Sequence, residues 1–395
     1  MNIVIDIRPL MEGKLSGVEM YMHHLLSHLL AMDRKNAYIL FANSAEDRTV
    51  HFPNIKQENV SIIQTHVPNK ILNASLIFFK KPKLDRLIIQ YFKRHPHKKP
   101  ANFRDGKIDV FFMPDLRPSA LSKNVRKIMV VHDLSFHHFP QFFSARSRLW
   151  HRLMNPKKEI MESESLIAVS HFTKKDLMET YKVDSSKIHV IHEGIENSFC
   201  NGITKTDIES ARGKYRLPEK YFLFLSTLEP RKNINAMISA FQVFKDRHPE
   251  NKLKLVIAGS SFNKIFSKVT MEKHSDVYFP GFIEEIDKGA VIKGAEAFIY
   301  PSLFEGFGLP LLEAMKCGTP VMTSNRSSMP EVIGNAGILV DPENPLHIAE
   351  AMREILKPDV RNRLLTNMAR QIQKFSWEKC AKETLHVLTS GRTGK

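Results

Sequence analysis

Short apolar runs alternate with helical patterns along the chain, and this alternation strongly limits the folds open to it. Strands that alternate with helices form parallel sheets covered by helices. The sequence contains two series of such runs, at 2–8, 37–42, 60–67, 108–114, 127–133 and 165–170, and then at 221–227, 253–259, 277–282, 295–302, 319–325 and 336–342. Two series predict an α/β chain with two doubly wound sheets of the Rossmann type.

A polar stretch near 201–218 separates the two series. We therefore expect an N-terminal Rossmann-like domain over residues 1–200 and a C-terminal one over 201–375. A last helix over 376–395 is expected to pack back on the N-terminal domain. The 395 residues suffice for two domains of about 200 residues each. Because ligands of doubly wound sheets bind at the carboxyl ends of the strands, we expect a ligand in a cleft between the domains.

The composition limits the possible classes of protein but does not identify a binding partner. The net charge is +16, and the positive excess leans toward the first half. That charge suits nucleic acid, an anionic membrane surface or a phosphate-bearing ligand. The three cysteines, Cys200, Cys317 and Cys380, are far apart and odd in number, which argues against a disulfide framework and for a reducing cytosol. No run reaches the roughly 18 to 20 apolar residues of a membrane-spanning helix, and the N-terminus does not resemble a signal peptide.

The segment "FEGFGLPLLEA" (304–314) carries two glutamates around a glycine-rich turn. It follows a predicted strand and precedes a helix that we expect to begin at Pro310. Amide groups at such a helix N-terminus suit a phosphate, and glycines let the backbone approach it. Glu313 can accept hydrogen bonds from vicinal hydroxyls, as on a ribose, and Glu305 can do the same for a sugar. The alternative is that Glu305 is a solvated loop residue and Glu313 an ordinary helix residue.

The longer segment 300–342, "YPSLFEGFGLPLLEAMKCGTPVMTSNRSSMPEVIGNAGILVDP", resembles the nucleotide-binding signature of the family 4 glycosyltransferases. These are retaining enzymes of the GT-B fold, in which two Rossmann-like domains face each other across a cleft. The resemblance extends over nearly the whole chain. It implies that Glu313 binds the ribose of a donor nucleotide and Glu305 the donor sugar. It also implies that the main chain of Gly306, Phe307, Gly308 and Leu309 binds sugar hydroxyls and the distal phosphate.

Two further parts of the second half resemble the same family. "STLEPRKN" (226–233) is similar to its basic diphosphate clamp, which implies that Arg231 and Lys232 neutralise the leaving diphosphate. The sequence has Thr227 where the family more often has an arginine, so Arg231 is expected to substitute for it. "VIAGS" (256–260) and "FPGFI" (279–283) resemble the strand ends that frame the base, and they place Gly259 and Ile283 beside it.

The first half contributes two residues to the predicted site. Gly17, in "SGVEMY" (16–21), matches a loop glycine whose amide approaches the donor phosphate in this family. His132, in "VVHDLSFHHFP" (130–140), matches a residue that contacts the donor sugar. The alternatives are structural: a glycine before a capped helix is a common turn, and a lone histidine in an α/β protein is usually structural.

The segment 75–107 is basic and carries Leu84, Leu87, Ile88 and Tyr91 at helical spacing. A basic amphipathic helix can lie on an anionic membrane surface. The alternative is that its apolar face packs on the N-terminal domain while its charges are solvated.

The chain has no Asp-X-Asp triplet, which a metal-dependent sugar transferase would usually carry. We therefore predict a metal-independent glycosyltransferase without a cofactor, with a nucleotide diphosphate sugar as its co-substrate. We expect it to move a hexosyl group, in the most specific hypothesis a mannosyl group from GDP-mannose, to a hydroxyl of a glycan or lipid-linked acceptor. The expected setting is synthesis of a cell-surface polysaccharide such as lipopolysaccharide, in the cytoplasm or peripherally on the inner face of the plasma membrane.

Three other classes remain open. One is a non-catalytic module that binds nucleotide sugars or polyanions. Another is a nucleic-acid binder, against which no nucleic-acid-binding motif appears, so we expect no nucleic acid partner. The third is a GT-B phosphorylase or epimerase, for which no convincing lysine site for pyridoxal phosphate is found.

Overall fold

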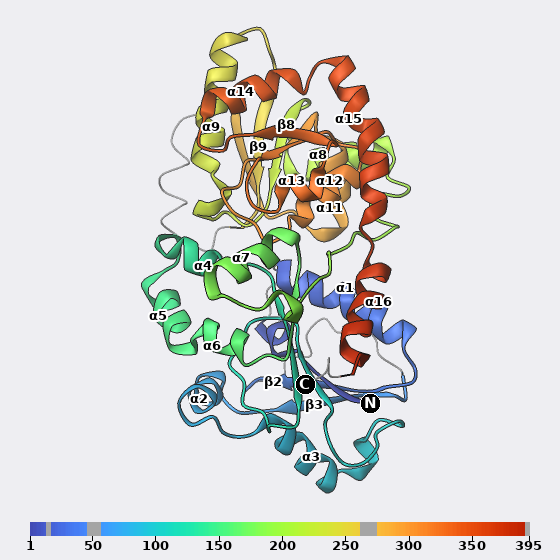
Figure 1. Ribbon diagram of the computed structural model, residues 1–395. Helices are drawn as coiled ribbons and strands as arrows, with labels where there is room; N and C mark the ends of the chain where they lie inside the picture. Colours follow the sequence, from blue (N-terminus) through green and yellow to red (C-terminus); the bar gives the residue numbers. More distant parts are fainter. Residues whose placement is uncertain (13–16, 46–56, 261–274, 392–395) are drawn as a thin grey trace. The chain divides into compact units, whose positions relative to one another are not determined.

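The fold of the chain is that of a computed structural model that describes residues 1–12, 17–45, 57–260 and 275–391. The chain divides into two compact units, Met1–Glu193 with Trp377–Lys395, and Gly194–Ser376. Figure 1 shows that each unit is a strand layer with helices around it. Among the described residues, no helix combines the length and the apolar character needed to cross a bilayer.

The first unit is built on a seven-stranded sheet whose strand pairs are all parallel. In chain order its strands are β1 (Asn2–Asp6), β2 (Ala37–Asn43), β3 (Val60–Thr65), β4 (Val110–Met113), β5 (Arg126–Val131), β6 (Ser165–Ala168) and β7 (Ile188–Val190). Their spatial order is β3-β2-β1-β4-β5-β6-β7. Strands β1, β2, β4 and β5 are buried along their whole length, as strands covered on both faces must be.

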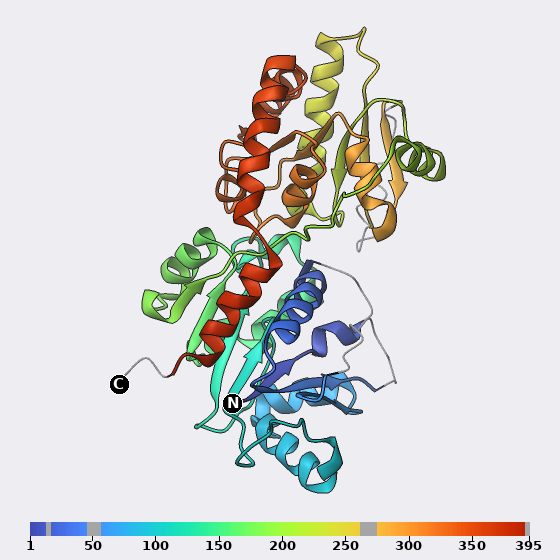
Figure 2. The ribbon, with the colours of Figure 1, turned by 90° about the vertical axis from the view of Figure 1, so that its right-hand side faces the viewer.

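The helices of the first unit are α1 (Gly17–Met32), α2 (Asn69–Ala74), α3 (Leu84–Arg94), α4 (Ser135–His138), α5 (Ala145–Met154), α6 (Pro156–Met161), α7 (His171–Tyr181) and α16 (Trp377–Thr389). A π-helical turn, η2 (Ser75–Phe79), follows α2, and short 3-10 turns lie at Arg8–Glu12, Pro96–Lys98, Pro140–Phe142 and Ser185–Lys187. Helix α16 lies against α1 (Figure 2). The ring of Trp377 stacks there on that of His24. The chain therefore returns to the first unit at its C-terminal end.

The amphipathic pattern of α3 is explained by packing within the first unit. Leu84, Ile88 and Phe92 are buried in its apolar core, and Leu87 and Tyr91 pack against that core partly buried. The apolar face of α3 therefore packs on the first unit, as the alternative interpretation expected, while its basic side chains, Arg86, Lys93 and Arg94, are exposed.

The second unit has a six-stranded parallel sheet in the order β10-β9-β8-β11-β12-β13. Its strands are β8 (Tyr221–Leu225), β9 (Lys254–Ala258), β10 (Val277–Gly281), β11 (Ala297–Tyr300), β12 (Val321–Ser324) and β13 (Gly337–Val340). Its helices are α8 (Lys205–Tyr215), α9 (Ile234–Arg247), α11 (Glu285–Lys293), α12 (Leu309–Lys316), α13 (Met329–Ile333), α14 (Pro345–Glu354) and α15 (Pro358–Gln371). Short 3-10 turns lie at Pro230–Lys232 and Ile372–Lys374.

Both sheets have a topological switch point, which is the place between two neighbouring strands whose following connections run to opposite sides of the sheet. In the second unit it lies between β8 and β11, because β9 lies on one side of β8 and β11 on the other. Ligands of doubly wound sheets bind at the carboxyl ends of the strands beside this point. The prediction of two doubly wound α/β sheets is confirmed.

One expectation about the cysteines is wrong. Cys200 and Cys317 are joined as a disulfide, with Cα atoms 5.2 Å apart, while Cys380 is free and buried. The two partners are 117 residues apart in the sequence, and only the fold of the second unit brings them together. Spacing along the chain could not reveal this pair, because nothing local links the turn at Cys200 to the end of α12.

Candidate active site

The loops that follow β8 and β11 meet at the switch point of the second sheet. Each loop begins where a buried strand ends, so its polar groups emerge at the carboxyl edge of the sheet. The amide of Leu303 donates to the carbonyl of Arg231 at 2.8 Å, and the side chain of Asn233 donates to the carbonyl of Pro301 at 3.1 Å. These bonds fix the loop of Arg231 and Lys232 to the loop that carries Glu305.

Glu305 binds both cations of the predicted clamp. Its Oε1 accepts a hydrogen bond from Lys232 Nζ and its Oε2 one from Arg231 Nη1, each at 2.6 Å. Glu305 and Lys232 are buried, at 6% and 4% exposure, whereas Arg231 is partly exposed. Glu305 is therefore not a solvated loop residue. Arg231 also pairs through Nε with Glu229 Oε2 at 2.8 Å, so the two cations of this cluster face two carboxylates.

The electrostatics of the cluster follow from burial and crowding. Burial would raise the pKa of Glu305, but Arg231 and Lys232 outweigh it and lower that pKa to about 2. Burial and the neighbouring Arg231 lower the pKa of Lys232, although Glu305 opposes them. Glu305 is therefore ionised at neutral pH. Lys232, in contrast, loses solvation of its ammonium on burial, which disfavours its charged form.

Tyr300 is a member of this cluster that sequence reasoning missed. Its hydroxyl oxygen accepts a hydrogen bond from Lys232 Nζ at 2.5 Å and lies 3.1 Å from Glu305 Oε1. Burial, followed by the charge of Glu305, raises the pKa of Tyr300 well above its ordinary value, so the hydroxyl stays protonated. The available signal was a tyrosine at the end of a buried strand, because a buried hydroxyl needs a partner.

The glycine-rich turn leads into α12 as the sequence predicts, one residue earlier than Pro310. Gly308 stands at the N-cap with φ +112°, a backbone conformation that favours glycine. Ser328 Oγ donates to the carbonyls of Glu305 and Phe307 at 3.1 and 2.8 Å, which fixes the course of the turn. The side chain of Phe307 is buried and its ring packs against that of Phe375.

Glu313 lies inside α12, buried at 8% exposure. Its Oε1 accepts a hydrogen bond from Lys288 Nζ of α11 at 2.5 Å. Its Oε2 is buried without a hydrogen-bond partner among the described residues. Burial outweighs Lys288 and raises the pKa of Glu313. An unsatisfied buried acceptor is unfavourable in a folded protein, so this oxygen is suited to a donor from a ligand.

Lys288 was also missed, and no local sequence signal marks it. Burial lowers its pKa, but Glu313 and Glu285 outweigh burial, and the net effect is a raised pKa. The ammonium is therefore charged, and it holds one oxygen of Glu313 while leaving the other without a partner.

The remaining predicted residues of the second unit frame these two glutamates. Gly259 directly follows β9 and has φ +141°, and a Cβ there would lie 1.8 Å from the carbonyl oxygen of Ser226. Gly259 therefore allows the ends of β8 and β9 to approach closely. Thr227 lies half-buried in the loop after β8, and Ile283 is buried between β10 and α11.

The two predicted residues of the first half lie in the first unit. Gly17 is the first residue of α1, and the preceding Ser16 lies outside the described residues. His132 follows β5, with Nε2 3.0 Å from the carbonyl oxygen of Pro114 and Nδ1 3.5 Å from Glu193 Oε1. Burial would lower the pKa of His132, but Glu193 outweighs it and raises that pKa. Both ring nitrogens therefore have protein partners, and Glu193 is a neighbour that sequence reasoning missed.

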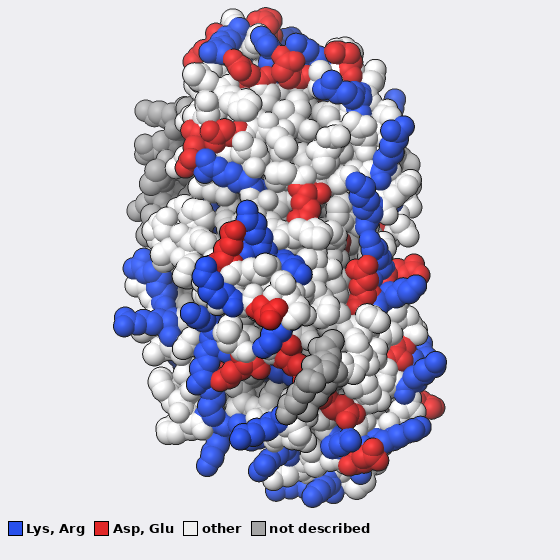
Figure 3. All heavy atoms as spheres, viewed as in Figure 1, with Lys and Arg blue, Asp and Glu red and all other residues white. Residues whose placement is uncertain are grey.

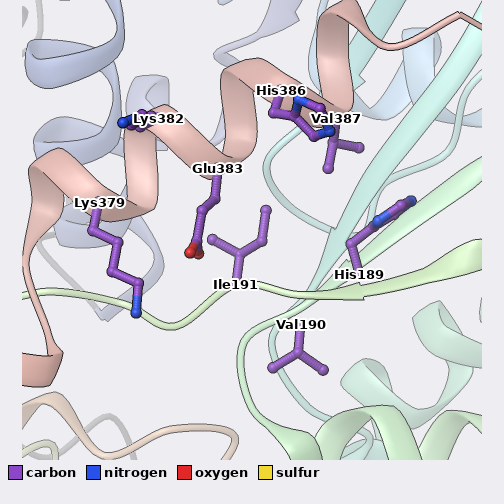
Figure 4. Close-up of a pocket in the computed structure, with 8 residues that line it drawn as sticks. All are labelled: His189, Val190, Ile191, Lys379, Lys382, Glu383, His386 and Val387. Atoms are coloured by element: carbon purple, nitrogen blue, oxygen red, sulfur yellow. The ribbon is translucent and has the colours of Figure 1, made fainter.

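A hollow in the first unit contains none of the predicted residues. It lies between β7 and α16, has a volume of about 520 Å³ and is lined in part by His189, Lys379, Lys382 and His386 (Figure 4). Burial, followed by the charges of Lys174 and His386, lowers the pKa of His189. The candidate site therefore rests on the two clusters around Glu305 and Glu313.

Two protein-family descriptions match the chain. Residues 207–375 match the family described as "Glycosyl transferases group 1", and residues 15–199 match "Glycosyltransferase Family 4". The O-antigen chain mannosyltransferase B of Escherichia coli is 25% identical over 98% of this chain and 99% of its own length.

Solved structures share the fold. The sucrose-phosphate synthase of Thermosynechococcus elongatus aligns with a TM-score of 0.71 at 19% identity, over 98% of both chains. The Anabaena protein HepE, solved in complex with UDP and glucose, aligns with a TM-score of 0.67 at 16% identity, over 99% of this chain and all of that one. The two family matches together leave out only the ends of the chain and a short stretch between 199 and 207. The chain therefore belongs to the glycosyltransferases of the GT-B fold.

Proposed function

We propose that the chain transfers a hexosyl group from a nucleotide diphosphate sugar to a hydroxyl of a glycan or lipid-linked acceptor, with retention of configuration. The observation that carries this proposal is the buried, unpartnered Oε2 of Glu313 next to an oxygen held by Lys288. A ribose offers adjacent hydroxyl donors to such an oxygen. The second support is the pair of cations beside Glu305, because a guanidinium and an ammonium at one strand end can bind a diphosphate.

In this proposal the second unit binds the donor. Glu313 binds the ribose, and the main-chain amides from Gly306 to Leu309 bind the sugar and the distal phosphate. Arg231 and Lys232 face the charge that grows on the leaving diphosphate, and Glu305 holds both cations in place before the donor arrives. Gly259 and Ile283 frame the base, and Thr227 shapes the loop of the clamp.

The transfer step needs no residue to form a covalent bond with the sugar. The acceptor hydroxyl attacks on the same face as the leaving group, the sugar–phosphate bond breaks, and the diphosphate takes the hydroxyl proton. We propose that neither a metal nor a cofactor takes part. Gly17 and His132 keep the roles toward the donor that the resemblance implies, and the first unit binds the acceptor.

A mannosyl donor, GDP-mannose, is the most specific form of the proposal. The name of the Escherichia coli relative, an O-antigen chain mannosyltransferase, supports it. The same name supports a role in synthesis of a lipopolysaccharide or another cell-surface polysaccharide. We propose that this role is carried out on the cytoplasmic side of the membrane.

The test is a panel of nucleotide sugars, with binding measured by calorimetry and turnover by release of the nucleoside diphosphate. We expect one donor to bind and Glu313→Ala to weaken its binding at least tenfold, because the ribose loses its acceptor. Glu350→Ala, which removes an exposed carboxylate from α14, is the matched control. The proposal fails if no donor binds, or if Glu313→Ala binds as tightly as the control.

A further inference from the structure

Large apolar side chains are exposed on two neighbouring segments of the first unit. We call them the apolar patch: Ile71, Phe78 and Phe79, at 62%, 62% and 73% exposure, and Leu149, Trp150 and Leu153, at 57%, 36% and 42%. The first three belong to α2 and η2, and the last three to α5. Single exposed apolar residues are ordinary, whereas a contiguous group marks a surface that contacts a partner or a membrane.

Helix α5 shows that this exposure is not incidental. It has ten residues, of which only Met154 is buried. A helix on the surface of a globular unit normally buries an apolar stripe against the core. Here the large apolar side chains of the helix remain outside, so packing of the first unit does not account for them.

An ion-pair network connects the two segments. Lys80 directly follows Phe79, and its Nζ lies 2.8 Å from Glu159 Oε1 on α6. Glu159 is buried and also pairs with Lys127 Nζ at 2.5 Å. This network fixes the end of η2 against α6, which follows α5 after a single residue. Figure 1 shows α2, α5 and α6 along the same side of the first unit.

Basic side chains surround the apolar patch. This basic rim consists of Lys70, Lys81, Arg146, Arg148, Arg152, Lys157 and Lys158, all of them exposed. The acidic residues of the same segments are Glu159, which is buried and paired, and Glu162, which lies within 4.0 Å of Lys80 and 3.8 Å of Lys158. Figure 3 shows Lys and Arg gathered along the edge of the first unit that carries these helices. The rim therefore complements a negatively charged surface.

We propose that the apolar patch and its basic rim dock the chain on an anionic lipid surface. Phe78, Phe79 and Trp150 enter the interface, and the rim contacts lipid phosphates. The location differs from the helix that the sequence suggested, because the apolar face of α3 is buried in the core and only Phe78 and Phe79 of the segment 75–107 belong to the patch. The proposal does not depend on the transfer reaction.

The first test is co-sedimentation of the full chain with vesicles of phosphatidylcholine, with and without about 30 mol% phosphatidylglycerol. We expect binding to the anionic vesicles alone. Phe78→Ser/Phe79→Ser, Leu149→Ser/Leu153→Ser and Arg148→Glu/Arg152→Glu should each lower the apparent affinity roughly tenfold or more.

Two control variants match these changes elsewhere. Leu346→Ser removes a side chain that is 51% exposed on α14 of the second unit. Lys93→Glu/Arg94→Glu reverses two exposed charges on α3. Both controls should bind anionic vesicles within about twofold of the unchanged chain, since neither touches the patch or its rim. If they lose as much binding as the patch variants do, the proposed surface is wrong.

The two tryptophans supply a second readout. Trp150 belongs to the patch, and Trp377 is buried at 2% exposure. Anionic vesicles should shift the tryptophan emission to shorter wavelength, and Trp150→Phe should abolish this shift while the variant still sediments. Equal binding to neutral and anionic vesicles would overturn the proposal. So would an emission shift that appears without lipid as the protein concentration rises, because that result indicates a second copy of the chain on the patch.

Discussion

The loops at the carboxyl ends of the two sheets hold their titratable groups in different ways. In the second unit, Glu305 binds two cations, and Glu313 keeps one oxygen without a hydrogen-bond partner among the described residues. In the first unit, both nitrogens of His132 have protein partners. The second unit thus has a buried acceptor that a ligand hydroxyl can satisfy, whereas the imidazole in the first unit is held in place by two protein partners. Four substitutions test this contrast.

Glu305→Ala should have the largest effect, because it removes the common anchor of Arg231 and Lys232. We expect turnover to fall roughly 100- to 1000-fold, with a much smaller change in donor binding. Steady-state kinetics with the identified donor would measure this split, with circular dichroism to confirm that the variant is folded. A variant that loses donor binding and keeps its turnover would contradict the role of Glu305 as an anchor for the clamp.

Gly259→Ala tests whether the ends of β8 and β9 must approach as closely as the structure shows. An added Cβ would meet the carbonyl oxygen of Ser226 at 1.8 Å, at a positive φ. We expect a loss of about 3 kcal/mol in the free energy of unfolding. Gly318→Ala is the control, since its φ of +73° is also positive but nothing lies within 4 Å of the added atom. It should cost only about 1 kcal/mol. Equal losses in urea titrations would show that the contact is unimportant.

Tyr300→Phe examines the third partner of the clamp. It removes the hydroxyl that contacts Lys232 and Glu305 and leaves the ring in place. We expect kcat to fall about tenfold while KM changes less than about twofold, because one hydrogen bond that orients the lysine is lost. Tyr221→Phe is the matched control: this buried tyrosine donates to the carbonyl of Val291 instead. The two variants should differ in kcat, and similar values would remove Tyr300 from the clamp.

Glu193→Gln should have the smallest effect and should act through pH. Glu193 raises the pKa of His132, so the pair stabilises the first unit below the unfolded pKa of histidine, and this stability is lost as pH rises through the raised value. In the variant, the free energy of unfolding should therefore fall by ~1 kcal/mol less than in the unchanged chain as pH rises above about 6.5. Glu305 has the opposite sign, because its pKa is lowered to about 2 and its contribution is lost as pH falls from about 4.3 toward that value.

Urea unfolding at several pH values would measure the effect of Glu193→Gln. Both tryptophans belong to the first unit, so their emission reports its unfolding separately from that of the second unit. An unchanged pH profile in the variant would mean that Glu193 does not set the protonation of His132.

The sequence predicted the parts of the fold and site that depend on local patterns. Alternating apolar runs predicted two parallel sheets, and the turn between Glu305 and Glu313 predicted a helix that begins beside a strand end. The sequence did not predict ion-pair partners that are far apart along the chain and are brought together only by the fold. Lys288 reaches Glu313 across 25 residues, and Glu193 reaches His132 from the far end of the first unit's main segment.

The segment around α3 shows a second limit of prediction from sequence, which concerns the side chains that are buried. Helical spacing of Leu84, Ile88 and Phe92 is the same whether the apolar face enters a core or a membrane interface. The structure buries these residues and exposes Phe78 and Phe79 on the preceding turn instead. Composition identified a basic and apolar region, but only burial could tell which side chains face outward.

The return of α16 to the first unit has a consequence for biosynthesis. The first unit consists of Met1–Glu193 and Trp377–Lys395, so its last helix is synthesised after the whole of Gly194–Ser376. During translation the second unit can fold before α16 is made. Until then α1 is not covered by α16, and the rings of Tyr21 and His24 lack their contact with Trp377. A chain cut just before Trp377 would therefore retain all of the second unit and leave α1 without the helix that covers it.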